Sequence, residues 1–395
     1  MISFDEAVEL VRQTALPLGT ETASLENAAG RVLASPVIAR IESPRNDVSA
    51  MDGYAVRDSD LTALPTRLRV AGKSFAGASW NEDLQSGVCV RIFTGAAVPS
   101  GADRVIMQED VRRDGDTAII GDQPGKARHI RRKGSDFGEG EELLPAGRLL
   151  DPRAIIAAAA ADLTGVEVYR RPSVRILSTG DELANPGSAG GIRDAIPESV
   201  SFGIAALAAQ WGAKVLDRVR VADDIERMEE IAAQATRGTD LVIVTGGASV
   251  GEKDFAKAMF EPMGLDLFFS KVSIKPGKPV WLGRAGNALV MGLPGNPTSA
   301  FVTARLLLAP LIARLSGRKI EEALGWQRAR LSAPLRECGP RETFHRGRWT
   351  GNEVELFDFQ DSSAQKVLAR SDVLVRQRAN SPARSTGSEV DVLAL

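Results

Sequence analysis

The sequence predicts a multidomain α/β protein built around a doubly wound, mostly parallel sheet. Its 395 residues exceed the size at which one hydrophobic core normally stops growing, so we expect two to four domains. Between about Pro172 and Leu315, apolar strand patterns alternate with amphipathic helix patterns, which is typical of βαβ units. Strand patterns without such helices lie on both sides of this region.

Composition excludes several classes of protein. Charged residues make up 25% of the chain and hydrophobic residues 44%, as in ordinary globular proteins. A net charge of −2 argues against a nucleic-acid or membrane-surface binder. The most apolar stretches, 154–161 and 300–315, are too short or too interrupted to cross a bilayer. Ser3 and Glu6 have capping-box spacing and no signal-peptide pattern precedes them, so we expect a helix there and a cytoplasmic protein.

Cysteine and histidine are scarce. The two cysteines (Cys89, Cys338) and two histidines (His129, His345) are far apart in the chain, which argues against a disulfide framework or a His/Cys zinc site. If the protein uses a metal, oxygen atoms must hold it, and this favours Mg²⁺.

From about Pro36 to Gly121 the sequence predicts a mostly β module with candidate polar loops. Asp52 lies in the loop SAMDGY and Thr94 follows the apolar run Val88–Phe93; each is also compatible with a simple turn. A basic run that includes Arg131 faces Asp136 across a glycine turn, and it is equally compatible with a solvated surface.

The central α/β region contains the strongest local signals. We expect strands at 174–177, 214–221 and 241–244, and helices at 198–211 and from a cap at Asp224 to Thr236. Ligands bind at the carboxyl ends of the strands in such sheets. Thr179 and Glu182 follow the first strand, and the segment DLVIVTGGASVGEKD places Asp254 after the third. Its turn residues Gly246, Gly247, Ser249 and Gly251 suit a phosphate site, although a tight turn alone would look similar.

Two further motifs in this region suit anions. In LPGNP, which contains Pro294, Asn296 is placed as the N-cap of a helix and Pro297 as its first residue, which also describes a plain helix start. In FSKVSIKPGKP, strand alternation puts Lys271 and Lys275 on one face. An edge strand protected by lysines is the alternative.

Six motifs, taken in order, resemble molybdopterin molybdenumtransferase, the family that includes the gephyrin E domain. They are SAMDGYAV, TGAAVPSGAD, STGDEL, TGGASVGEKDF, IKPGKP and GLPGNPTSA, and they cover nearly the whole chain. The resemblance implies insertion of molybdate into adenylylated molybdopterin, with Mg²⁺-assisted cleavage of the adenylyl group and release of AMP. It further implies an elongated homodimer whose active-site cleft is formed by both subunits. The protein that adenylylates molybdopterin and the recipient molybdoenzymes or their chaperones are then candidate partners.

The same resemblance assigns roles to residues. Active-site groups fall on Asp52, Asp136, Glu182, Asp224, Asp254, Lys271 and Lys275, with Asp224 and Asp254 preferred as metal ligands. With the loops described above, the expected substrate-binding residues are Thr94, Arg131, Thr179, Gly246, Gly247, Ser249, Gly251, Pro294, Asn296, Arg341, Arg346 and Ser362. Of these, Arg341 or Arg346, with Ser362, would hold molybdate.

Four domains are expected from the patterns and the resemblance together. They are a discontinuous N-terminal mixed domain (1–40 with 137–171), an inserted mostly β domain (41–136), an α/β molybdopterin-binding domain (172–317) and a C-terminal β-barrel-like domain (318–395).

The chain departs from the family pattern at two places: Asp194–Ala195–Ile196 replaces Asp-Ser-Asn, and Val48 replaces an asparagine. The substitution at Ile196 favours one alternative, a non-catalytic or specialised molybdopterin-binding scaffold or insertion partner. The other alternative is an adenylyltransferase acting on free molybdopterin, which resembles the region Pro172–Leu315 alone; the additional N- and C-terminal regions argue against it.

Overall fold

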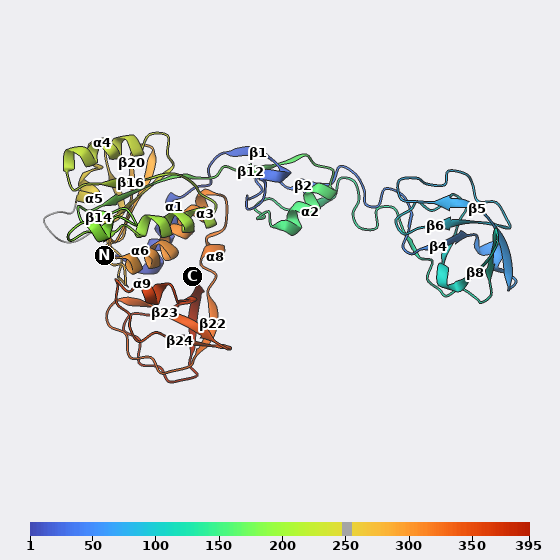
Figure 1. Cartoon of the computed structure of the whole chain (residues 1–395). Coiled ribbons are helices and arrows are strands. Elements are labelled where there is room, and N and C mark those ends of the chain that lie inside the picture. Colours follow the sequence, from blue (N-terminus) through green and yellow to red (C-terminus); the bar gives the residue numbers. More distant parts are fainter. Residues whose placement is uncertain (247–254) are drawn as a thin grey trace.

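The structure, a computed structural model, describes residues 1–246 and 255–395. Figure 1 shows an elongated molecule in which the α/β region and the C-terminal region lie at one end and a separate β unit lies at the other. A small middle unit, formed by residues 20–38 and 142–169, lies between them.

The α/β region is built on a six-stranded sheet in the order β16-β13-β17-β21-β20-β18. The first four strands are parallel and the last two run antiparallel to their neighbours, so the predicted mostly parallel sheet is confirmed. The strands are β13 (Ser173–Thr179), β16 (Lys214–Val221), β17 (Leu241–Thr245), β18 (Asp266–Phe269), β20 (Trp281–Ala285) and β21 (Ala288–Leu293). Strand β17 is buried along its whole length, as expected of a parallel strand covered on both faces.

Helices cover both faces of this sheet, which confirms the doubly wound architecture. One face packs in a core with α3 (Val200–Gln210), α6 (Pro297–Thr303), the π-helical segment Ala304–Leu308 and α7 (Ala309–Leu315). The other face packs against α4 (Ile225–Ala235) and α5 (Phe255–Ala258). Contrary to the expectation for 300–315, the continuous helix Pro297–Leu315 is long and apolar enough to cross a membrane, but 89% of its apolar window is buried within the structure, as in a core helix.

Helix α1 (Phe4–Thr14) joins the α/β region to the C-terminal region. The predicted capping box of Ser3 and Glu6 starts the helix. Its buried residues share the core of the α/β sheet. The Phe4 ring also meets Phe344 at 5.1 Å and Trp326 at 6.4 Å, centroid to centroid. Residues 4–14 therefore pack with the sheet rather than with the middle unit.

The C-terminal region is a closed five-stranded barrel, as the sequence predicted. The order β23-β24-β22-β26-β25 closes through pairing of β25 with β23. Its strands are β22 (Gln327–Leu331), β23 (Glu342–Thr350), β24 (Glu353–Leu356), β25 (Val373–Gln377) and β26 (Glu389–Ala394), and short strand β19 (Ile274–Lys275) joins β23. Short helices α8 (Ile320–Ala323) and α9 (Gln365–Leu368) accompany it.

The middle unit is formed by chain segments that come before and after the distal unit in the sequence. Strand β1 (Thr20–Ser24) pairs with β12 (Gly165–Tyr169), and β2 (Val37–Ile38) pairs with β11 (Glu142–Leu144) beside helix α2 (Pro152–Ala160). The distal unit, residues 48–131, has its own sheet in the order β7-β4-β6-β5-β9-β8 and two buried apolar clusters. Its strands are β3 (Val48–Ser49), β4 (Gly53–Val56), β5 (Thr66–Ser74), β6 (Val88–Ile92), β7 (Arg104–Met107), β8 (Val111–Asp114), β9 (Thr117–Ile120) and β10 (Ile130–Arg131).

Candidate functional site

A pocket of about 720 Å³ lies where the carboxyl ends of β13, β17 and β21 meet. We call it the strand-end pocket. Its lining includes Thr179, Gly180, Glu182, Ile196, Asp223, Thr245, Gly246, Pro294, Asn296, Ser363 and Gln365. This edge of a parallel sheet is where the sequence predicted a ligand.

Tight backbone packing fixes the floor of the pocket. Gly246 has φ +93°, and a Cβ atom there would lie 2.4 Å from the Thr179 carbonyl oxygen. Glycine is therefore required for the loops after β13 and β17 to approach each other. Gly180, with φ +146°, allows the Glu182 carboxylate to fold back, because a Cβ atom at position 180 would lie 2.7 Å from Glu182 Oε2. Thr179 and Glu182, both predicted site residues, thus line one pocket.

Two adjacent acids after β16 have different environments. Asp224 caps α4 as predicted, its Oδ1 accepting the Arg227 amide at 3.0 Å. Asp223 lines the strand-end pocket, and its amide donates to Asp181 Oδ1 at 3.0 Å. Sequence reasoning named Asp224 and missed Asp223. The sequence signal that could have revealed Asp223 was the presence of two adjacent acids after a predicted strand.

Glu198 is a second acid that sequence reasoning missed. It lines the pocket and is 7% exposed. Its carboxylate accepts hydrogen bonds from the Ser201 amide at 2.8 Å and the Ser201 hydroxyl at 2.6 Å. These bonds satisfy an acid that would be costly to bury without partners.

The LPGNP loop brings the C-terminal region to the pocket. Asn296 is the N-cap of α6 and Pro297 its first residue, as predicted. The side-chain amide of Asn296 donates to the Ser362 hydroxyl at 3.2 Å, and the backbone amide of Thr298 donates to the Ser362 carbonyl at 3.2 Å. Ser362 is therefore brought to Asn296, and its neighbours Ser363 and Gln365, which sequence reasoning missed, line the pocket.

Arg346 is an unusual group beneath this loop. It is fully buried, and its Nη2 donates to the Asp361 carbonyl at 3.2 Å. Its Nε and Nη1 have no hydrogen-bond partner within the described part of the chain. Burial lowers the pKa of Arg346 from its usual range. Arg341 is only half-buried, with its Nη1 3.5 Å from the Ile274 carbonyl oxygen. Of the two arginines, Arg346 is the one with unused donors in the interior.

The segment FSKVSIKPGKP, which contains Lys271 and Lys275, shows the predicted alternation of buried and more exposed side chains. Val272 and Ile274 are fully buried in the core, whereas Lys271 is half-buried and Lys275 is exposed. Burial lowers the pKa of His345, and the positive charges of Arg346 and Lys275 lower it further. Positive charge therefore accumulates around β23, next to the loop that carries Ser362.

Asp52 and Thr94 form a site of their own in the distal unit. Asp52 Oδ1 accepts hydrogen bonds from the Thr94 amide at 2.8 Å and the Thr94 hydroxyl at 2.7 Å. These bonds lower the pKa of Asp52. Within one chain the distal unit lies at the opposite end of the molecule from the strand-end pocket (Figure 1). The structure therefore brings Asp52 and Thr94 together but does not bring them to Glu182.

Arg131 and Asp136 also lie away from the strand-end pocket. Arg131 lies on β10, opposite Val48 on β3, and its side chain is exposed. Asp136 is exposed on the segment that returns from the distal unit, and its amide donates to the Ser43 carbonyl at 3.0 Å. The basic run and this acid remain candidate site residues of the distal side.

Four predicted residues, Gly247, Ser249, Gly251 and Asp254, lie outside the described residues. Among residues 1–246 and 255–395, no group of three or more His, Cys, Asp or Glu side chains is arranged to hold a metal. Of the substituted segment 194–196, Ile196 lines the strand-end pocket, whereas Asp194 is exposed beside Arg193.

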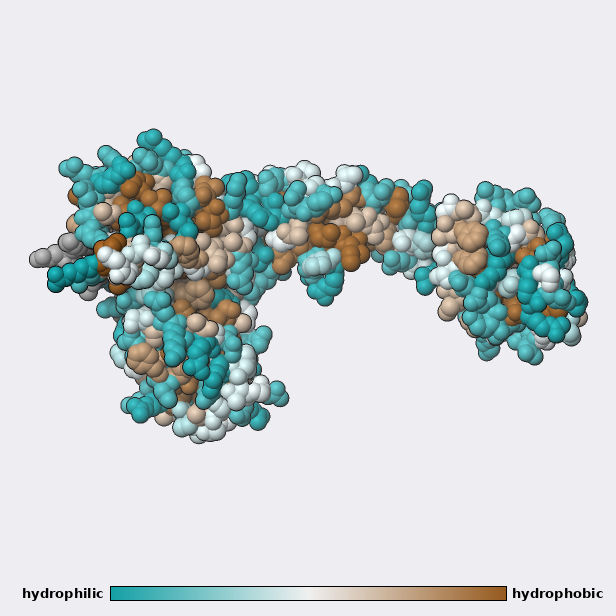
Figure 2. Space-filling model, in the orientation of Figure 1, coloured by the Kyte–Doolittle hydropathy of each residue, from teal (hydrophilic) through white to brown (hydrophobic). Residues whose placement is uncertain are grey.

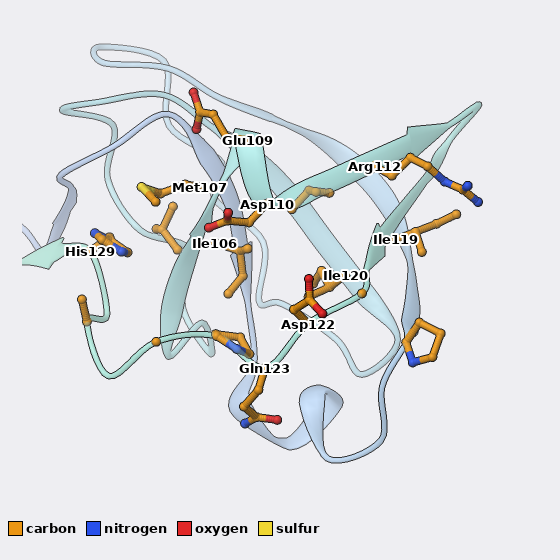
Figure 3. A pocket seen from close by; sticks show the side chains of 17 residues that line it. Ile106, Met107, Glu109, Asp110, Arg112, Ile119, Ile120, Asp122, Gln123 and His129 are labelled. Carbon is orange, nitrogen blue, oxygen red and sulfur yellow. The ribbon is translucent and has the colours of Figure 1, made fainter.

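A second cavity of about 720 Å³ lies in the distal unit (Figure 3). Ile106, Ile119 and Ile120 are nearly buried beneath it, and acids such as Glu109, Asp110 and Asp122 surround it. None of the residues predicted from the sequence to bind substrate lines this cavity. The strand-end pocket is therefore the better candidate site.

Comparison with known proteins matches three family models to successive parts of the chain. Residues 2–161 match the MoeA N-terminal region (domain I and II), residues 175–314 a probable molybdopterin binding domain, and residues 328–395 the MoeA C-terminal region (domain IV). A molybdopterin molybdenumtransferase from Haemophilus influenzae is 39% identical, over 98% of this chain and 97% of its own length. A protein of the same name from a Nostoc species is 33% identical over 95% and 89%. A crystal structure of the molybdopterin biosynthesis protein MoeA from Pyrococcus horikoshii has a TM-score of 0.83 and 28% identity, covering 100% of this chain and 99% of that one.

Proposed function

Because this chain belongs to the molybdopterin molybdenumtransferase family, we propose that it acts on adenylylated molybdopterin and releases AMP as molybdenum is inserted. The chain is an enzyme of molybdenum cofactor biosynthesis, and its reaction is molybdenum insertion. The adenylyl group and the release of AMP are the proposed part. The family resemblance implies them, and the chemistry of the strand-end pocket supports them.

The observation that carries the proposal is the composition of that pocket. Glu182 and Asp223 supply two carboxylates that suit a cation. The pyrophosphate-like bond of the substrate needs charge neutralisation when it breaks. A cation held by these acids would supply that neutralisation.

We place molybdate next to Arg346, Ser362 and Lys275. Arg346 has two unused donors in the interior, and a buried guanidinium without an anion is unfavourable. Molybdate is a dianion with four acceptor oxygens, so it suits these donors. Ser362 contacts Asn296 at the pocket, which gives molybdate a short route to the pterin dithiolene. Binding both partners on one protein overcomes the repulsion between two electron-rich groups.

Mg²⁺ fits the donor chemistry of the pocket. Among the described residues, Glu182 and Asp223 offer oxygen ligands there, and Asp254 remains a predicted third. One or two carboxylates plus substrate phosphates are the usual environment of this ion in proteins. When bound, Mg²⁺ would neutralise phosphate charge as the adenylyl group leaves. Asp223 lines the pocket and Asp224 is absent from its lining, so Asp223 is the better placed of the two acids.

We further propose a homodimer with a shared active site. Asp52 and Thr94 lie at the far end of the same chain from Glu182, so a partner's distal unit is needed to complete the pocket. Figure 2 shows hydrophobic surface on the middle unit, where Ile156 is 70% and Ile38 40% exposed. Apolar side chains that are as exposed as these suit a contact between subunits. We also propose a cytoplasmic location, with the adenylylating enzyme upstream and recipient molybdoenzymes or their chaperones downstream.

A matched pair of variants tests the function. Purified protein with adenylylated molybdopterin, Mg²⁺ and molybdate should release AMP and form molybdenum cofactor. Glu182→Gln should lose at least ~100-fold in rate, as expected when a group acting on the departing charge is removed. Glu226→Gln, on the exposed side of α4, is the control and should react like the wild type. Equal rates for Glu182→Gln and wild type would contradict the assignment of the pocket.

A further inference from the structure

Part of the lining of the strand-end pocket is apolar and includes Ile196. Ile196 lines the pocket with 52% of its surface accessible. Leu183, which pairs with Ile196, and the neighbouring Pro197 and Val200 also line the pocket. The lining further includes Asp223, which follows β16, and Asn296, which follows β21. A large aliphatic side chain that is exposed in the lining of the pocket assigned to the substrate can contact the ligand directly.

The backbone holds Ile196 in this position from both sides. Strand β14 (Leu183–Ala184) pairs in parallel with β15 (Ile196–Pro197). The Ile196 amide donates to the Glu182 carbonyl at 2.8 Å, and the Glu198 amide donates to the Ala184 carbonyl at 2.8 Å. Because the Ile196 amide is hydrogen-bonded to the Glu182 carbonyl, the Ile196 side chain stays next to the acid assigned to the reaction. A contact surface that is ordered before the ligand arrives costs little entropy on binding.

We propose that Ile196 is a specificity-determining contact for the pterin ring system of the substrate. The ring system is flat, so one of its faces can pack on Ile196 and Pro197, whereas the phosphate groups suit a cation held at Asp223. This inference rests on the proposed function. It gives the residue that departs from the family pattern a positive role in place of a lost amide contact.

Ile192 provides a matched control within the same segment. It is 54% exposed, close to the exposure of Ile196, and it does not line the strand-end pocket. A substitution at either position removes a similar amount of exposed apolar surface. A difference between the two therefore reports contact with the ligand and not a general effect of surface polarity.

The test measures affinity for two separate ligands. The full-length wild type, Ile196→Asn, Ile196→Ala and Ile192→Asn would be titrated with molybdopterin lacking the adenylyl group, followed by pterin fluorescence, and separately with AMP. We expect both Ile196 variants to bind molybdopterin about tenfold more weakly, from the loss of roughly half an isoleucine side chain of buried area. Their affinity for AMP, and both affinities of Ile192→Asn, should match the wild type. Unchanged melting temperatures would confirm that the variants are folded.

Two results would overturn the inference. Wild-type affinity of Ile196→Asn for molybdopterin would show that the ring system does not touch this side chain. Weaker binding of AMP with unchanged binding of molybdopterin would show that Ile196 contacts the adenosine instead. Failure of the proposed function is a separate outcome, because the wild type would then form no molybdenum cofactor in the transferase assay. The inference alone fails when the wild type is active and the Ile196 variants bind molybdopterin equally well.

Discussion

Replacing Arg346 with methionine should stabilise the protein while removing its response to molybdate. A buried N–H group without a partner costs ~1–3 kcal/mol, and Arg346 has two such atoms, Nε and Nη1. The substitution loses one hydrogen bond, from Nη2 to the Asp361 carbonyl, which contributes ~1 kcal/mol. Methionine keeps most of the apolar packing. The two unpaired atoms together cost ~2–6 kcal/mol, so we expect the free energy of unfolding to rise by about 1–5 kcal/mol, close to the range seen when buried charges are replaced.

Urea unfolding with and without molybdate measures both effects. Trp326 and Trp349 report on the C-terminal region through their fluorescence. Molybdate at 100 times its Kd should stabilise the wild type by about 2.7 kcal/mol and Arg346→Met by nothing. Arg341→Met is the control, because that half-buried side chain has one long contact; it should keep the molybdate response. An Arg346→Met variant that is less stable than wild type and still stabilised by molybdate would refute the reasoning.

Two other predictions concern charge. Hydrogen bonds from Arg170 and Ser173 keep the pKa of Asp240 low although burial alone would raise it, so Asp240→Asn should lose ~1–3 kcal/mol of unfolding free energy at pH 7. Because the folded-state pKa is depressed, this loss should shrink as the pH falls below about 3.9, and a loss independent of pH would contradict it. Lys275→Ala should weaken substrate binding at low salt and less at high salt; a lower melting temperature with unchanged affinity would favour the protective edge-strand role.

Local sequence signals predicted the elements well. The capping box at Ser3, the cap at Asp224 and the start of α6 at Asn296 depend on residues within one helical turn, and all three are confirmed. The strand Lys214–Val221 has the predicted bounds. Strand patterns predicted a C-terminal β domain, and its barrel-like form was expected with the family resemblance, but closure through β25 and β23 depends on pairing between distant segments.

The site was only partly predictable, because a pocket depends on where separate loops meet. Nothing local distinguishes Asp223, which lines the pocket, from Asp224, which caps a helix. Gln365 reaches the pocket from the C-terminal region. Helix α1 packs in the α/β core although 158 residues separate Thr14 from Ser173. The amphipathic pattern of α1 predicts that one face of the helix is buried, but it does not predict which part of the chain covers that face. The roles assigned to the site residues stay predictions.

Subunit complementation tests the central claim most directly. Asp52→Ala and Glu182→Gln should each be inactive, because each removes one half of every shared site. In a mixed dimer, one site takes Glu182 from the first subunit and Asp52 from the second and is intact. Dissociating and reassociating an equal mixture should therefore restore about a quarter of wild-type cofactor formation, since half the dimers are mixed and each has one intact site. Two inactive variants that stay inactive when mixed as dimers would contradict the shared site.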